Sequence, residues 1–238
     1  MDLISKITLA FQHGGFWMYP ILITQLVTFA IMAERINALY IRRKTNQAKN
    51  AAHALEDNIR RGEISEAIKK ANSQFSGLAI SQVAIAGAEA AMNLGGKDEI
   101  QGKMDEVLLH ENSQLDRGIG FLATLGNVAT LTGLLGTITG MIKSFAPVAY
   151  ANPAEKAALL AAGISEAMNA TAYGLIVAIP ALVAYAALQY RANQISEDLN
   201  QSALKIFNWL SYTFDPVSLR NQAKTQSSKS SNNNEINA

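Results

Sequence analysis

A single carboxylate stands inside the longest apolar part of this sequence. Glu166 is the one acidic or basic residue in the 34-residue stretch 157–190. A charge at the centre of a bilayer costs about 3 kcal/mol, so such residues usually face a bundle interior or a cavity. On a helix, Asn169 and Tyr173 share its face and Pro180 continues it, which predicts an intramembrane polar stripe. The alternative is a first-turn acid at the membrane surface, favoured by the helix dipole.

A second polar set lies in the apolar stretch 118–146. At about 100° per residue, Asn127, Thr130 and Thr137 fall on one face of a helix. Three polar residues on one stripe indicate a surface that faces water or protein. The competing interpretation is that each threonine only bonds to a carbonyl of its own helix.

Small residues accompany both polar sets. Gly136 and Gly140 are spaced as a small-xxx-small pair, which lets two helices approach closely. The third apolar stretch is crowded with alanine and glycine, which favours packing against protein and predicts that the chain oligomerises. The positions expected to pack helices are Gly133, Gly136, Gly140, Gly174 and Pro180.

The composition argues against soluble and enzymatic functions. Charged residues make up 16% of the 238 residues, well below soluble domains, and a net charge of +1 argues against a nucleic-acid binder. There is no cysteine, the three histidines have no ligand spacing, and the glycines lack the Lys-Ser/Thr ending of a phosphate loop. We therefore expect no enzyme activity, no metal site and no cofactor.

Three charge-free runs organise the chain, at 7–33, 118–142 and 167–190. Each is long enough to cross a bilayer core, which needs about 20 residues. No strand pattern appears, so the predicted fold is all-α, an integral membrane protein with three transmembrane helices and a cytoplasmic helical domain. A cleaved signal peptide is disfavoured because the first run has no basic region before it and ends at Glu34-Arg35.

Basic residues set the expected orientation. Only Lys6, Lys143 and Lys156 of the 20 lie on the side of the N-terminus and of the loop between spans two and three, so the N-terminus is predicted outside and the C-terminus inside. The expected segments are 1–16, an interfacial helix; 17–40, the first span; 41–117, a cytoplasmic helical domain whose last helix runs straight into the second span; 118–146, the second span; 147–156, a periplasmic loop; 157–190, the third span; 191–214, a cytoplasmic helical extension; and 215–238, a disordered tail.

Two blocks of sequence resemble the MotA/TolQ/ExbB proton-channel family, in its three-span TolQ/ExbB-like branch. They are residues 133–145 (GLLGTITGMIKSF) and 163–180 (GISEAMNATAYGLIVAIP). Thr137 and Thr171 match the pore-lining threonines of the family, and Glu166 matches its third-span glutamate. On that resemblance, their hydroxyls could relay protons or orient water. Thr171 lies about 140° from Glu166 around the helix, so the two side chains point to different places.

The resemblance also implies the assembly. Such subunits form a ring, typically a pentamer, in the bacterial inner membrane around a dimer of a single-span protein like ExbD or TolR. Proton flow drives a load, in TonB-type uptake, Tol-Pal maintenance or gliding-type motility, with a TonB- or TolA-like or motility protein as a further partner. At Thr130 and Asn169 this chain is more polar than is common in the family. The added polarity beside the expected pore leaves sodium open as the coupling ion. The alternative function is a non-conducting oligomeric membrane scaffold.

Overall fold

The computed structural model describes residues 15–42, 47–93 and 96–214. The expected interfacial helix at 1–16, apart from its last two residues, and the expected tail at 215–238 lie outside these ranges. Every regular element in the described ranges is helical, which confirms the all-α prediction. The chain divides into two compact units, which combine Met1–Arg42 with Asp116–Arg191 and Arg43–Leu115 with Ala192–Ala238.

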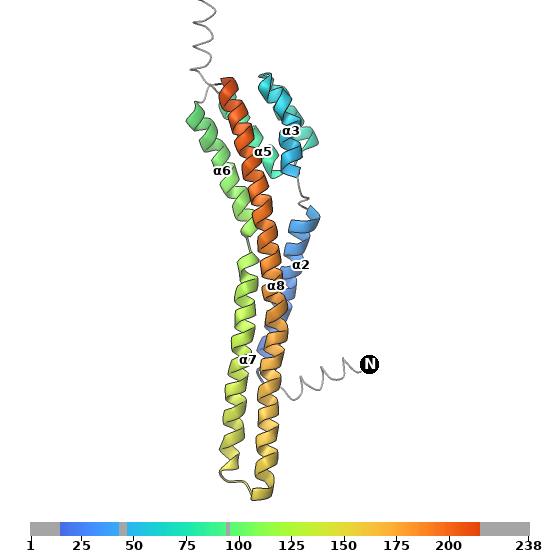
Figure 1. The fold of residues 1–238 in the computed structure, drawn as a ribbon, viewed down its shortest axis with the longest axis vertical. Helices are drawn as coiled ribbons and strands as arrows, with labels where there is room; N and C mark the ends of the chain where they lie inside the picture. Colours follow the sequence, from blue (N-terminus) through green and yellow to red (C-terminus); the bar gives the residue numbers. More distant parts are fainter. Residues whose placement is uncertain (1–14, 43–46, 94–95, 215–238) are drawn as a thin grey trace, which may run out of the picture. The chain divides into compact units, whose positions relative to one another are not determined.

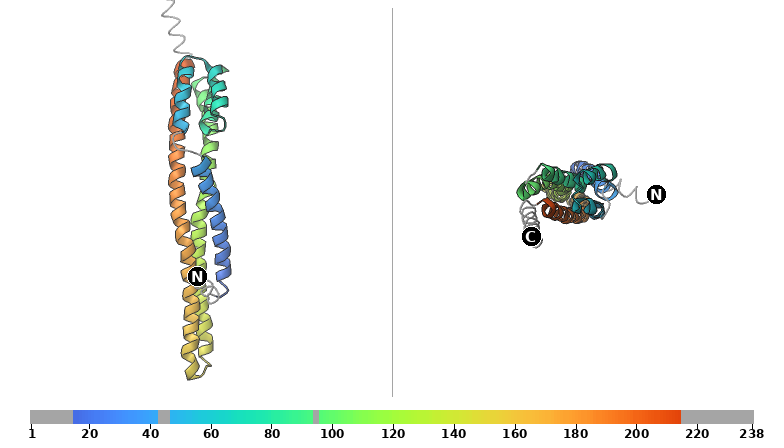
Figure 2. Two further views of the ribbon diagram at one scale, coloured as in Figure 1. Left: turned by 90° about the vertical axis from the view of Figure 1, so that its right-hand side faces the viewer. Right: turned by 90° about the horizontal axis from the view of Figure 1, so that it is seen from above.

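The first unit contains three long apolar helices, drawn in Figure 1. They are α2 (Met18–Ile36), α7 (Ile119–Val148) and the part of α8 (Pro153–Phe214) that ends at Arg191. The three helical stretches long and apolar enough to cross a membrane contain these helices, which confirms the prediction of three spans. The left view of Figure 2 shows α2 alongside α7, and large apolar side chains on all three helices are exposed.

The ends of these helices differ from the expectation in two places. The first span does not end as a simple α-helix, because Asn37–Arg42 continues α2 as a π-helical segment, η1. Its Tyr40 ring lies 5.4 Å below the Arg191 guanidinium. The loop between the second and third spans is shorter than 147–156, since α7 runs to Val148 and α8 begins at Pro153.

A break separates the second span from the preceding helix. The expected straight continuation is wrong: α6 (Lys97–Asp116) ends two residues before α7 begins, and Gly118 between them has a φ of 80°. This left-handed conformation suits glycine because it has no Cβ. Arg35 packs over the turn, with its Nε 3.3 Å from the position a Cβ would take.

Gly118→Ala is therefore expected to lower the stability of the protein by about 1–2 kcal/mol, the usual cost of a left-handed residue with a side chain. Gly118→Asn is expected to cost less, because asparagine tolerates this conformation. Thermal unfolding of the purified protein in detergent measures both. Equal midpoints for Gly118→Ala and the unchanged protein would show that the turn is not strained.

The second unit is a helical bundle. It contains α3 (Gln47–Arg60), α4 (Ile64–Gln74), α5 (Ala79–Met92), most of α6 and the end of α8. Its core is formed by buried side chains from all five helices, among them Leu55, Ile64, Val83, Met104 and Ile206. The turn between α3 and α4 is at Gly62, whose φ is 76°.

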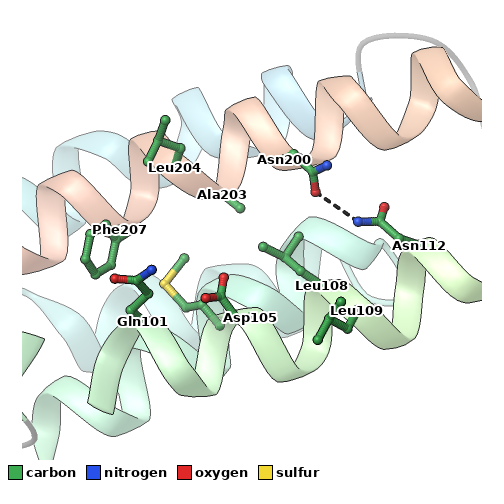
Figure 3. Close-up of a pocket in the computed structure, with 10 residues that line it drawn as sticks. Gln101, Asp105, Leu108, Leu109, Asn112, Asn200, Ala203, Leu204 and Phe207 are labelled. Carbon is green, nitrogen blue, oxygen red and sulfur yellow. Dashed lines mark hydrogen bonds between the residues drawn. The ribbon is translucent and has the colours of Figure 1, made fainter. Parts of the chain in front are cut away.

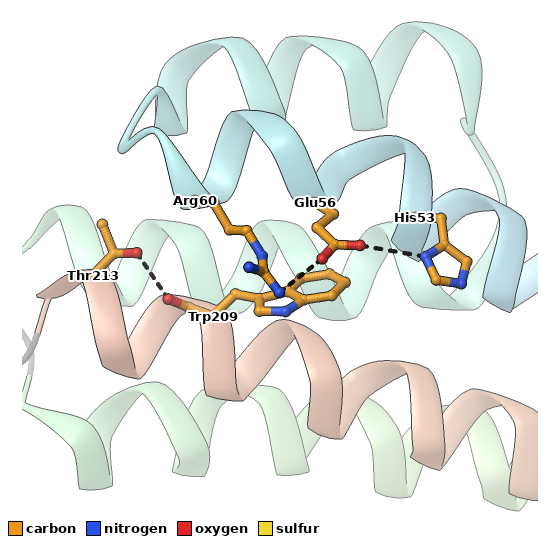
Figure 4. Close-up of polar contacts among 5 residues, drawn as sticks. All are labelled: His53, Glu56, Arg60, Trp209 and Thr213. Atoms are coloured by element: carbon orange, nitrogen blue, oxygen red, sulfur yellow. Dashed lines mark hydrogen bonds and ion pairs between the residues drawn. The ribbon is translucent and has the colours of Figure 1, made fainter.

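Polar contacts hold α3 against the end of α8. Figure 4 shows Arg60 of α3 with its guanidinium 5.7 Å from the centre of the Trp209 ring, and ion-paired with Glu56 at 2.9 Å. Lys49 and Asp198 add a second pair at 2.7 Å. Because both contacts join residues far apart in sequence, they fix α8 as a core helix of this unit.

A groove of about 430 Å³ lies between α6 and α8 in the same unit. Figure 3 shows Leu108, Leu109 and Phe207 among its apolar lining, with an Asn112 to Asn200 hydrogen bond of 3.0 Å at one end. Asp105 is the one ionisable residue in the lining. The groove therefore offers apolar surface and no charged pair suited to acid–base chemistry.

Candidate functional site

Helices α7 and α8 meet along a seam of small residues in the first unit. A Cβ built on Gly174 would lie 2.7 Å from the Ala129 carbonyl oxygen, and one on Gly133 would lie 3.1 Å from the Ala170 carbonyl oxygen. At Gly140 the nearest atom would be the Ala167 Cβ, at 3.1 Å. Only glycine allows the backbones to come this close, and such seams hold helices together in membranes.

The glycine seam also contacts the first span. Gly136 lies between α8 and the start of α2, because a Cβ there would lie 2.6 Å from the Ala170 Cβ and 3.3 Å from the Trp17 Cβ. Further along, Ile21 of α2 is buried with Ala129 and Val177. The four glycines expected to pack helices therefore lie at buried contacts within one chain. Pro180 is exposed instead, so the expectation that it packs these helices does not hold inside one chain.

Two threonine hydroxyls meet inside the seam. Thr137 of α7 and Thr171 of α8 are hydrogen-bonded to each other through their Oγ1 atoms. Thr171 also donates to the Gly133 carbonyl oxygen at 3.0 Å, and Thr137 lies 3.3 Å from the carbonyl oxygens of Gly133 and Ala167. Each hydroxyl has one proton and two lone pairs. The pair can therefore form a chain of hydrogen bonds between α7 and α8 and still accept a hydrogen bond from a group outside the two helices.

The other threonines of α7 behave differently. Thr130 bonds to the Gly126 carbonyl at 3.1 Å and Thr132 to the Val128 carbonyl at 2.7 Å, each within its own helix. Thr130 is thus not joined to Thr137, although the two share a stripe. Asn127 is exposed on the same helix. Of the predicted stripe, only Thr137 reaches across to α8.

Glu166 has a basic neighbour on the other helix. Its Oε1 lies 3.8 Å from the Nζ of Lys143, and its side chain is 30% exposed against 63% for the lysine. Glu155 is the acid of the first turn of α8, so the helix-dipole explanation does not apply to Glu166. The carboxylate is half-buried between α8, α7 and the residues before α2.

Tyr173 connects the third span to the first. Its hydroxyl donates a hydrogen bond to the Oε1 of Gln25 in α2, and its ring packs beside Ile21 and Val177. Asn169, half-buried, lies between Tyr173 and Glu166 in the sequence. The predicted site residues therefore form two groups: the threonine pair between α7 and α8, and a set on α8 with its contacts on α2 and α7.

Two contacts were missed in the sequence. From the sequence, Lys143 contributes only to the predicted orientation, and Gln25 has no predicted role. The available signals were the presence of a lysine inside the family-like block 133–145 and of a single amide within the charge-free part of the first span, 17–33. Neither signal says which residue on another helix is the partner. The register of the helices decides that.

Three helices long and apolar enough to span a membrane, packed along a glycine seam, define a multi-pass membrane protein. The chain belongs to the MotA/TolQ/ExbB proton channel family, whose pattern matches residues 75–201, more than half of its length. This confirms the resemblance of the two sequence blocks. The members of this family are channel and motor subunits, and the expectation that the chain is not an enzyme is confirmed.

Individual relatives agree with this assignment. The Tol-Pal system protein TolQ of Haemophilus influenzae is 30% identical over 215 residues, covering 83% of this chain and 87% of TolQ. The biopolymer transport protein ExbB of Neisseria meningitidis is 28% identical over 191 residues, covering 76% and 84%. ExbB of Salmonella typhimurium is 38% identical over 93 residues, covering 39% of this chain and 38% of that relative.

Proposed function

We propose that the chain is the ring-forming subunit of an ion-driven motor in the bacterial inner membrane. Several copies, a pentamer by resemblance, would surround the transmembrane helices of a dimeric single-span partner like ExbD or TolR. Proton passage would drive movement between ring and partner. The observation that carries the proposal is the Thr137–Thr171 hydroxyl pair, held inside the α7–α8 seam of a proton-channel family member.

The hydroxyl pair has the chemistry that a proton path needs. Backbone carbonyls of α7 and α8 lie beside the pair, and the Gly133 carbonyl already accepts the proton that the hydrogen bond between the two hydroxyls leaves over. A carboxylate on a partner helix beside the pair would be costly to ionise in a dry environment. The free lone pairs of the hydroxyls could accept a hydrogen bond from that carboxyl group or from a water molecule.

Charge distribution supports the orientation, with the N-terminus outside and the C-terminus in the cytoplasm. Seventeen of the 20 basic residues lie outside the N-terminal stretch and outside the segment 143–156, which contains the α7–α8 loop. The load would be a Tol-Pal or TonB-type envelope system, as the names of the relatives suggest, or gliding-type motility. A TonB- or TolA-like protein would then be a further partner. Sodium would serve as the coupling ion if the proton does not.

Purification and reconstitution test the proposal together. The tagged full-length chain is pulled down from its native membranes, and single-span proteins that copurify are identified by mass spectrometry. Chain and partner are then reconstituted into vesicles with a trapped pH-sensitive dye, and proton uptake is followed under an imposed membrane potential. Flux is expected only when both proteins are present.

A parallel set of vesicles with a sodium gradient and a sodium-sensitive dye identifies the coupling ion. Vesicles that hold the chain alone and vesicles treated with a protonophore set the lower and upper limits of the signal. A complex that assembles with its partner but conducts neither ion would contradict the motor. It would favour the non-conducting scaffold.

A further inference from the structure

The Lys143–Glu166 ion pair joins two of the three spans. Lys143 is on α7 and Glu166 on α8, so the pair bridges the two helices that contribute the hydroxyl pair. Its separation of 3.8 Å is long, and the lysine side chain is 63% exposed. Such a pair contributes little to stability. The main consequence of the pair is that the positive charge of Lys143 on α7 is balanced by a negative charge on α8.

The carboxylate of this pair has a defined place. A Cβ built on Gly15 would collide with the Glu166 carboxylate, so the side chain lies directly against the backbone that precedes α2. Glu166 is thus enclosed by backbone on one side and faces the lysine on the other. This explains why an acidic side chain is only 30% exposed beside an otherwise apolar span.

The pair also lies close to the hydroxyl pair. Thr137 bonds to the carbonyl of Ala167, the residue that follows Glu166. Lys143 lies six residues beyond Thr137 on α7, about 9 Å along the helix axis, towards the loop that joins α7 to α8. On the proposed ion path, a cation at the hydroxyls would therefore lie about 9 Å along the helix axis from this charged pair.

An unbalanced lysine at that place would oppose the cation. Two like charges about 9 Å apart near a protein surface repel each other. This repulsion lowers the occupancy of a cation beside the hydroxyls on the order of tenfold. With Glu166 ionised beside it, the net charge of the pair is zero, and most of this repulsion disappears. The carboxylate is therefore needed even if no transported ion ever binds to it.

We propose that Glu166 acts as the counter-charge of Lys143, and that the ion path requires this compensation of the lysine charge, not ion transfer by the carboxylate. The inference rests on the proposed ion-conducting function. It predicts that an uncharged pair works as well as the charged pair. A carboxylate that relays the ion itself would instead be irreplaceable whatever residue stands at 143.

The test is a charge-neutralisation series in the reconstituted complex of the chain with its copurified partner. Glu166→Gln is expected to lower proton flux on the order of tenfold. Lys143→Gln alone is expected to conduct at least as well as the unchanged protein. The double variant K143Q/E166Q is expected to restore the flux to within about threefold of the unchanged protein, since no unbalanced charge remains.

The matched control is K156Q/E166Q, because Lys156 is on α8, ten residues or about 15 Å from Glu166. It should conduct as poorly as Glu166→Gln. A K143Q/E166Q variant that assembles with the partner and stays as slow as Glu166→Gln would overturn the inference while leaving the motor intact. If the complex of the unsubstituted chain with its partner shows no proton flux, the proposed function is overturned instead.

Discussion

Gly174→Ala is expected to destabilise the three-helix unit by about 1–3 kcal/mol, the usual cost of overfilling a packed site. The added methyl would lie 2.7 Å from the Ala129 carbonyl oxygen and 3.2 Å from the Gly133 Cα. Both are backbone atoms, which cannot move aside as the end of a flexible side chain can. The two helices would have to separate, and with them the hydroxyls of Thr137 and Thr171.

Gly120→Ala is the matched control on α7, because a Cβ there meets nothing within 4 Å. Alanine is the better helix former by about 1 kcal/mol, so this variant is expected to be as stable as the unchanged protein or slightly more stable. Thermal unfolding in detergent and size-exclusion chromatography compare the two. Similar midpoints for both variants would show that the seam is not tightly packed.

The three spans could be predicted because the bilayer imposes a simple length requirement. A helix that crosses about 30 Å needs about 20 apolar residues, and charge-free runs of that length are rare in soluble helices. The seam could also be anticipated, since Gly136 and Gly140 have the spacing that allows close approach. Both features are local in sequence, so the pattern alone contains them.

The contacts across helices could not be predicted in the same way. Glu166 was placed on a polar face, but its neighbour Lys143 lies on another helix, and the choice of neighbour depends on how far α7 slides along α8. The break at Gly118 was missed because a single glycine is compatible with a continuing helix. The π-helical segment after Ile36 has no pattern of its own in the sequence.

The threonines of α7 show the same limit on a small scale. Thr130 and Thr137 are of one type, lie on one stripe and bond to the carbonyl four residues before them. Only Thr137 has a second hydroxyl opposite it, because Thr171 meets α7 at a point where the glycines bring the backbones together. Function at this site therefore depends on packing as much as on residue type.

Removing either hydroxyl of the pair is expected to lower proton flux on the order of 100-fold, the range in which a positioned proton-transfer group contributes. Thr137→Val and Thr171→Val keep the shape of the side chain and remove the oxygen. Because the two hydroxyls act as one unit, the double variant should lose little more than either single variant. Thr171→Ser retains the hydroxyl and is expected to conduct nearly as well as threonine.

Thr132→Val is the control for both, since the Thr132 hydroxyl bonds only to the Val128 carbonyl of its own helix, at 2.7 Å. It should conduct at the level of the unchanged complex. Proton uptake into vesicles, normalised to the amount of assembled complex, measures all five variants. If Thr137→Val and Thr132→Val conduct alike, the hydroxyl pair serves only to hold α7 against α8, and the ion path must be sought on another face of the spans.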